Sequence, residues 1–297
     1  MDTQMVLVAR CLRLGLVLGA ALASGAMAAG VAVAAVPDQL SQQILNAQKA
    51  QAERHFGKAL DIYGRAITPG ANDQDLRLLL KKRALVFEQI RQTTKAEADF
   101  TAALGVEPID PALYADRGYF YLRQSRYDKA LADFVTGARI DPANPLFVFA
   151  VGRVRAAMAD YRGAIERYNA ALSIDGKYAV AILSRAEAYV HLDMLQEAKE
   201  DYDKAMGLRF MREGDRFFAF LGRGYVNILL EDFDTAVQDL DQALDAEPSN
   251  LNALLYRGYA YERRGDDELA LRDYERAFAA SPDNVWVRTS LQRLRSN

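Results

Sequence analysis

The sequence predicts an all-helical protein, a right-handed superhelical solenoid of antiparallel helix pairs. A pattern of residue sizes returns every 34 residues between about residue 40 and residue 284. Inside each 34-residue unit, apolar residues recur at intervals of three and four, which places them on one face of a helix. Small residues return at fixed positions, where two helix backbones would approach each other closely. A repeat of this length indicates stacked helical units rather than one globular core.

The period divides the chain into seven blocks, each with a helix A over about positions 1–14 and a helix B over about positions 15–30. The first block is looser than the others, and residues 213–216 interrupt the register once, either as a bend or as a longer loop. The blocks are 40–76, 77–110, 111–144, 145–178, 179–212, 217–250 and 251–284. Residues 285–297, with Trp286 and Leu291 set among arginines, are expected to form a C-terminal capping helix.

Three positions of each block are reserved for small side chains. Position 8 is alanine or glycine in every block, position 27 is also small, and position 24 carries a large side chain. We expect the small residues to let helices A and B approach, with Gly118 of one helix facing Ala130 of the other. Position 20 is alanine throughout, at Ala59, Ala96, Ala130, Ala164, Ala198, Ala236 and Ala270.

Asparagine and aspartate mark the starts of several A helices. Asp110 precedes Pro111 and Asn144 precedes Pro145, which places an N-cap side chain before a proline at the first helical position. The acidic segment that begins at Asn72 is interpreted as a helix cap. It lacks the glycine and the distant glutamate of a calcium-binding loop.

Two positions vary together and predict an ion pair between helices A and B. Five blocks have arginine at position 7 and aspartate at position 23, and the other two blocks have neither. Positions that change together usually touch, so we expect a salt bridge inside each of the five blocks. The pairs are Arg83 with Asp99, Arg117 with Asp133, Arg185 with Asp201, Arg223 with Asp239 and Arg257 with Asp273.

The block pattern resembles the tetratricopeptide repeat (TPR) family over essentially all of the chain after residue 40. Small residues at positions 8, 20 and 27, a large residue at position 24 and proline at position 32 of four blocks carry the resemblance. No block has the family's tryptophan at position 4, and Gly176 and Phe210 replace two of the prolines. The resemblance implies a scaffold that binds proteins or peptides and is not an enzyme.

The resemblance also implies where a partner would bind. In TPR proteins, positions 2, 5, 9, 12 and 13 of helix A line the concave groove, which we call the helix-A face. Transferring these positions gives a mixture of tyrosine, arginine and aliphatic side chains of the kind found in protein interfaces. The alternative is that several of them only fill gaps between neighbouring A helices. The candidates are Tyr119, Arg123, Phe149, Arg153, Leu183, Glu187, His191, Leu221, Tyr225, Tyr259 and Arg263.

Composition points away from most catalytic chemistry. The 297 residues carry 37 Lys and Arg against 40 Asp and Glu, and this net charge of -3 offers no field that would draw nucleic acid. Cys11 is the only cysteine and the two histidines lie far apart in the chain, so we expect no metal, no cofactor and no catalytic residue. A carboxylate-based enzyme acting on an envelope polymer is the alternative, and it requires a pair of buried acids with raised pKa values facing the groove.

The N-terminal segment has the pattern of a secretory signal peptide. Two arginines precede an apolar run, and small residues lead to an A-x-A site that ends at Ala34. We therefore expect residues 1–34 to be cleaved and the protein to be exported, periplasmic or secreted. An uncleaved inner-membrane anchor over residues 14–36 is the alternative. The sequence as a whole predicts an exported adaptor in a cell-envelope assembly or, in the anchored form, a membrane-tethered assembly factor.

Overall fold

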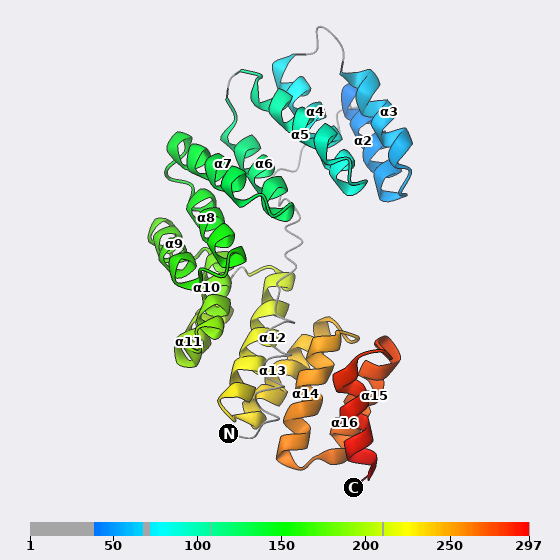
Figure 1. Ribbon diagram of the computed structural model, residues 1–297, viewed down its shortest axis with the longest axis vertical. Helices are drawn as coiled ribbons and strands as arrows, with labels where there is room; N and C mark the ends of the chain where they lie inside the picture. The colour runs from blue at the N-terminus through cyan, green and yellow to red at the C-terminus, as the bar shows by residue number, and fades with distance from the viewer. Residues whose placement is uncertain (1–38, 68–71, 108, 210, 297) are drawn as a thin grey trace. The chain divides into compact units, whose positions relative to one another are not determined.

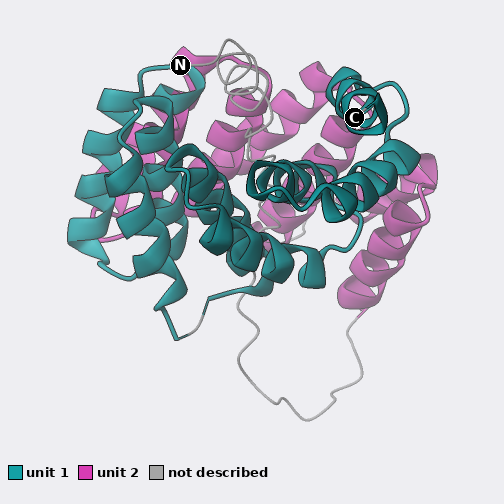
Figure 2. Ribbon diagram, turned by 90° about the horizontal axis from the view of Figure 1, so that it is seen from below, with its two compact units in different colours: residues 1–19, 155–297 teal, residues 20–154 magenta. Residues whose placement is uncertain are grey.

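The structure is a computed structural model that describes residues 39–67, 72–107, 109–209 and 211–296. These residues form α-helices joined by short turns, and none of them lies in a strand (Figure 1). The chain divides into two compact units between Val154 and Arg155 (Figure 2). We call the described residues up to Val154 the N-terminal unit and those from Arg155 onward the C-terminal unit. The predicted signal peptide or anchor lies outside the described residues.

Each predicted block corresponds to two consecutive helices. The division between the units falls within α8, which ends at Ala157. The helices that begin in the N-terminal unit are α2 (Gln39–Ala52), α3 (Phe56–Ala66), α4 (Asp73–Gln89), α5 (Thr93–Leu104), α6 (Pro111–Arg123), α7 (Tyr127–Ile140) and α8 (Pro145–Ala157). Those of the C-terminal unit are α9 (Tyr161–Ile174), α10 (Ala179–His191), α11 (Leu195–Met206), α12 (Glu213–Leu229), α13 (Phe233–Ala246), α14 (Leu251–Arg264), α15 (Asp267–Ala280) and α16 (Val285–Ser296).

The four residues that interrupt the sequence register are helical. Residues 213–216 form the first turn of α12, which is 17 residues long, and α4 has the same length and also starts one turn early. The insertion therefore extends a helix and does not form a loop.

The N-caps lie where asparagine and aspartate mark the helix starts. The Asn72 side chain accepts a hydrogen bond from the backbone N–H of Asp75 at 2.9 Å, so the acidic segment caps α4. The Asp110 side chain accepts from the backbone of Ala112, directly beside the proline at the first position of α6. The Asn144 side chain accepts from the backbone of Leu146 at the start of α8.

The turn from helix A to helix B requires a left-handed residue at position 15 of every block. Six of these residues are not glycine and have φ between 55° and 64°, and the seventh, Gly265, has φ 86°. This backbone conformation is costly for residues with a side chain, so the seven turns share a geometry that packing must hold. The six non-glycine residues are Arg54, Arg91, Ser125, Ala159, Asp193 and Glu231.

The small positions make room for large side chains. A Cβ atom added at Gly118 would lie 2.6 Å from the ring of Phe134, so Gly118 faces position 24 of helix B. A Cβ atom at Gly258 would likewise lie 2.9 Å from Tyr274. Each large position-24 side chain therefore fills the space that a small position-8 residue leaves between the two helices.

The last helix closes the C-terminal unit with one apolar and one polar side. Val287 and Leu291 of α16 are buried against the core, whereas Arg288 and Arg295 are exposed. Stacked repeats need such a terminal helix because an uncovered apolar face would otherwise meet water.

Candidate protein-binding surface

All five predicted Arg–Asp pairs are in contact. In each pair the guanidinium Nε and Nη2 donate to the two carboxylate oxygens of the aspartate, at 2.5 to 2.9 Å. The five aspartates are buried, with exposed fractions between 2% and 6%. Two-point contact with a planar guanidinium fixes the geometry of helix A on helix B as well as neutralising a buried charge.

Four of these arginines also reach back to the preceding block. Their Nη1 atoms donate to the side chain at position 25 of the preceding helix B, at 2.5 to 3.2 Å. We call the arginine with its aspartate and this third partner the clasp. The four third partners are Thr101 for Arg117, Asn169 for Arg185, Asp203 for Arg223 and Asp241 for Arg257.

The clasp persists across the insertion at residues 213–216. Arg223 and Asp203 are 20 residues apart in sequence, whereas the other three clasp contacts span 16 residues, yet the same guanidinium nitrogen makes the contact. A Cβ atom at Gly222 of α12 would clash with the Tyr202 ring of α11, so these two helices also pack without a gap. The joint between α11 and α12 is therefore built like its neighbours.

Aromatic side chains lie beside four of the five paired arginines. An aromatic residue at position 11 lies one helical turn after the arginine, with the guanidinium 5.7 to 5.9 Å from the ring centroid. This distance permits a cation–π contribution. Asn227 takes that position in α12 and donates to Asp239 at 3.0 Å instead. The aromatic residues are Phe87, Tyr121, Tyr189 and Tyr261.

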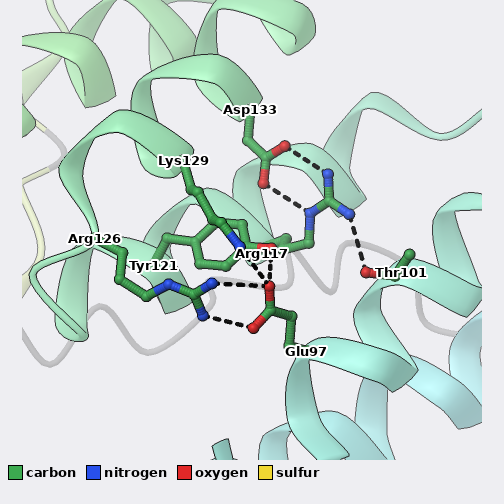
Figure 3. Close-up of polar contacts among 7 residues, drawn as sticks. All are labelled: Glu97, Thr101, Arg117, Tyr121, Arg126, Lys129 and Asp133. Atoms are coloured by element: carbon green, nitrogen blue, oxygen red, sulfur yellow. Dashed lines mark hydrogen bonds and ion pairs between the residues drawn. The ribbon is translucent and has the colours of Figure 1, made fainter. Parts of the chain in front are cut away.

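A second polar network joins α5 to α6 and α7 in the N-terminal unit (Figure 3). The Glu97 carboxylate accepts hydrogen bonds from Tyr121, Arg126 and Lys129, at 2.9, 2.5 and 2.9 Å. The hydrogen bond from Arg126, aided by Lys129 and Tyr121, lowers the pKa of Glu97 to about 2. Burial and the hydrogen bond to Glu97 raise the pKa of Tyr121 to about 12. The charged groups of this network are therefore paired with one another inside the N-terminal unit.

We expect the Glu97 network to stabilise the N-terminal unit in a pH-dependent way. The folded-state pKa of Glu97 lies below its unfolded value of about 4.3, so its contribution is present above that pH and is lost as pH falls toward about 2. Glu97→Gln should lower the free energy of unfolding at pH 7 by less than about 1 kcal/mol, because the carboxylate is partly solvated. Urea unfolding of both proteins from pH 7 to pH 2 measures the difference, which should shrink below about pH 4. A difference that stays constant would contradict the assignment.

The helix-A face of the N-terminal unit carries a set of paired polar side chains. Gln51 of α2 donates to Gln89 of α4, and Arg123 of α6 donates through two nitrogens to Glu88 of α4. The Lys81 Nζ atom lies 2.5 Å from the Oδ2 atom of Asp116. These contacts link successive A helices and engage Arg123, one of the predicted site residues.

The remaining candidates of that unit differ in exposure. Phe149 is buried and belongs to the core, whereas Tyr119 and Arg153 are only partly buried. Lys81, Glu88 and Gln89 are not among the predicted site residues, although they occupy positions 5, 12 and 13 of their block. Applying the same positions to block 77–110 would have identified them.

In the C-terminal unit, four of the candidates are buried. Leu183 and Leu221 are 5% and 4% exposed, and Tyr259 is 9% exposed. Tyr225 is fully buried and packs on Tyr256, with ring centroids 5.2 Å apart. This corrects the placement of Tyr225 on a binding surface, because adjacent A helices cover position 9 of α12. These four residues form an apolar floor beneath the helix-A face.

Three candidates keep exposed atoms above this floor. Glu187 and His191 are partly buried, and the His191 ring stacks on Tyr161 with centroids 4.1 Å apart. Arg263 is exposed, donates to the Tyr259 hydroxyl at 2.9 Å and lies over the Phe233 ring. The rim of the helix-A face in this unit is therefore polar and aromatic, which is a composition suited to protein contacts.

Neither unit contains, among its described residues, the two acids with raised pKa values that the enzyme alternative requires. Among the described carboxylates, burial raises the pKa of Asp116 and of Asp239. They belong to different units, and each contacts a cation of its own unit, Lys81 and Arg223. In the part of the chain that the structure describes, no three His, Cys, Asp or Glu residues gather closely enough to bind a metal ion. None of the described helices has the length and apolar character needed to cross a membrane.

The fold and the helix-A face define a helical-repeat scaffold with an interaction surface. The tetratricopeptide repeat family matches residues 81–145 and 230–285 in one form of the repeat and residues 179–210 in another, together about half of the chain. The chain belongs to the tetratricopeptide repeat family, whose members bind protein or peptide partners on a scaffold of this kind.

Several characterised proteins are similar over part of their length. DnaJ protein P58IPK homolog A of Oryza sativa subsp. japonica is 28% identical over 239 residues, which is 73% of this chain and 49% of that protein. Superkiller complex protein 3 of Homo sapiens is 26% identical over 137 residues, 46% of this chain and 9% of that protein. The chain thus spans about half of the rice protein and a far smaller share of the human one.

Solved structures show the same fold at low identity. A tetratricopeptide repeat protein from Parabacteroides merdae matches 87% of this chain and 99% of its own, with a TM-score of 0.60 and 17% identity. Pseudomonas aeruginosa pilF matches 75% of this chain and 98% of its own, with a TM-score of 0.61 and 15% identity. YrrB, described as a TPR protein with an unusual peptide-binding site, matches 65% of this chain and 97% of its own, with a TM-score of 0.52 and 18% identity.

Proposed function

We propose that this protein is an exported adaptor that holds segments of partner proteins on its helix-A face. The observation that carries the proposal is the division of that face into a buried apolar floor and a rim with exposed polar atoms. In the C-terminal unit this rim is formed by Glu187 and His191, which are partly buried, and by the exposed Arg263. Large amphipathic side chains above a rigid apolar layer supply contact area and oriented hydrogen bonds at a low entropic cost.

The pairing of the charged side chains also supports the helix-A face as the binding surface. The five arginines at position 7 are engaged by buried aspartates, so they are not available to a partner. The polar side chains of the rim are held on helices, which restricts their freedom before a partner arrives. Preorganisation of this kind favours binding of an extended segment.

The place of action is part of the proposal. The apolar N-terminal segment with its A-x-A site supports export, and the adaptor would then act in an envelope assembly. In the alternative, residues 14–36 are retained and the same face serves a membrane-tethered assembly factor. Fractionation of cells and N-terminal sequencing of the purified protein distinguish the two forms.

Binding is tested with the purified chain starting at residue 35. Proteins captured from an envelope extract are identified, and overlapping 15-residue peptides of the strongest partner are titrated by calorimetry. We expect Glu187→Ala with Arg263→Ala, both on the rim of the C-terminal unit, to weaken peptide binding about tenfold or more, since interface hot spots are worth at least about 1–2 kcal/mol. Gln238→Ala, at an exposed site on α13, is the matched control and should leave binding unchanged. Equal affinity of all three proteins would place the interface elsewhere.

A further inference from the structure

The Arg–Asp pair is missing from one internal block of the chain. In block 145–178, Val151 occupies position 7 and Arg167 occupies position 23, so the sequence offers neither the arginine nor the aspartate of the pair. The preceding block also lacks a polar acceptor at position 25, where Val135 is 58% exposed. The two halves of the clasp are thus absent together, on both sides of α8.

The division of the chain into compact units falls in the same block. It separates Val154 from Arg155, within helix A of block 145–178. The two observations are independent, because one concerns side-chain identities and the other concerns the distribution of contacts along the whole chain. Their coincidence singles out this block among those that lie between two other blocks.

The other interruption of the repeat does not have these properties. Residues 213–216 lengthen α12, and the clasp of Arg223 with Asp239 and Asp203 is intact at that joint. An insertion in the sequence is therefore compatible with an intact clasp, and a block of regular length is compatible with a missing one.

We propose that block 145–178 is the hinge of this protein and that the missing clasp is the cause. A bidentate ion pair fixes the rotation of helix A against helix B, and its third contact fixes one block against the preceding one. Apolar packing alone is less directional and permits small sliding of helices, the shear motion known from domain movements.

The test uses pairs of spin labels and the width of the distance distribution between them. The chain from residue 35 onward has no cysteine, so single cysteines can be introduced at exposed helical sites. Ala98→Cys with Gln238→Cys spans the proposed hinge. Gln196→Cys with Gln242→Cys spans the insertion within the C-terminal unit and serves as the control. We expect the first pair to give a distribution at least twice as wide as the second.

Restoring the ion pair tests the cause. Val151→Arg with Arg167→Asp should narrow the distribution across block 145–178 toward that of the control pair, and Val151→Arg alone should not. Removing a clasp with Arg223→Leu and Asp239→Leu should widen the control distribution. Circular dichroism spectra confirm that each variant is helical before labelling.

Each result bears on the proposal. A narrow distribution across block 145–178 in the unmodified protein would overturn the hinge. A broad distribution that the restored pair leaves unchanged, in a variant that folds, would overturn the missing clasp as its cause. Widening of the control pair on loss of the Arg223 clasp supports the proposal independently of the restored variant.

Discussion

Replacing Asp239 with alanine is expected to lower the free energy of unfolding by about 3–5 kcal/mol. Asp239 is 2% exposed and accepts hydrogen bonds from both Arg223 and Asn227. Its removal leaves a partly buried guanidinium without its main counter-charge, and leaves the Asn227 amide without its acceptor. Buried donors and charges that lose a partner pay the full cost of desolvation. Urea unfolding followed by circular dichroism measures the loss.

An exposed ion pair provides the matched control. Asp61 contacts Arg65 one turn away on α3, with both side chains more than half exposed. Asp61→Ala should cost less than about 1 kcal/mol, because exposed pairs gain little over their separate hydration. Arg223→Leu with Asp239→Leu should be less destabilising than Asp239→Ala alone, since no uncompensated charge remains. Equal losses in Asp239→Ala and Asp61→Ala would mean that the clasp does not hold the helices together.

The period of small and large residues sufficed to predict the fold. Helical repeats bury their apolar faces only against neighbours of the same kind, so each block must repeat the same sizes at the same positions. For this reason the prediction of an all-helical TPR fold is confirmed by the structure and by the family match. The Arg–Asp contact could also be predicted from the sequence, because five blocks have arginine at position 7 and aspartate at position 23.

Two other features of the structure could not be predicted, because no single residue type recurs at their positions in the sequence. The third partner of the clasp is threonine, asparagine or aspartate, because any side-chain oxygen can accept the hydrogen bond. The left-handed turn at position 15 uses residues as different as Ala159 and Glu231, since their side chains point to solvent. Neither could be found by looking for a repeated identity.

Burial on the helix-A face depends on the neighbouring blocks. Tyr225 and Tyr119 both stand at position 9, yet Tyr225 is fully buried and Tyr119 is partly exposed. Tyr256 of α14 packs on the Tyr225 ring, and a residue in another block sets this contact. A position rule taken from one block therefore cannot decide which side chains reach a partner.

The second large effect is expected at Gly137 of α7. Alanine normally stabilises a helix interior by about 0.5–1 kcal/mol relative to glycine. At Gly137 the added Cβ would overlap the ring of Phe147, which is 1% exposed in the core of the N-terminal unit. Overpacking of a filled core costs about 1–3 kcal/mol, so Gly137→Ala should be destabilising in spite of its helix propensity.

Gly57 of α3 supplies the control, because alanine at this position is not expected to lower the stability. No atom lies within 4 Å of a Cβ built at Gly57, so Gly57→Ala should leave stability unchanged or raise it slightly. Phe147→Leu introduced together with Gly137→Ala should recover part of the loss, since the smaller side chain vacates the space that the new methyl group needs. Chemical denaturation of the unmodified protein, Gly137→Ala, Phe147→Leu and the double variant measures the coupling. Stabilisation by Gly137→Ala would show that Phe147 can shift at no cost, and that the small residue at position 27 is not required for packing one block on the next.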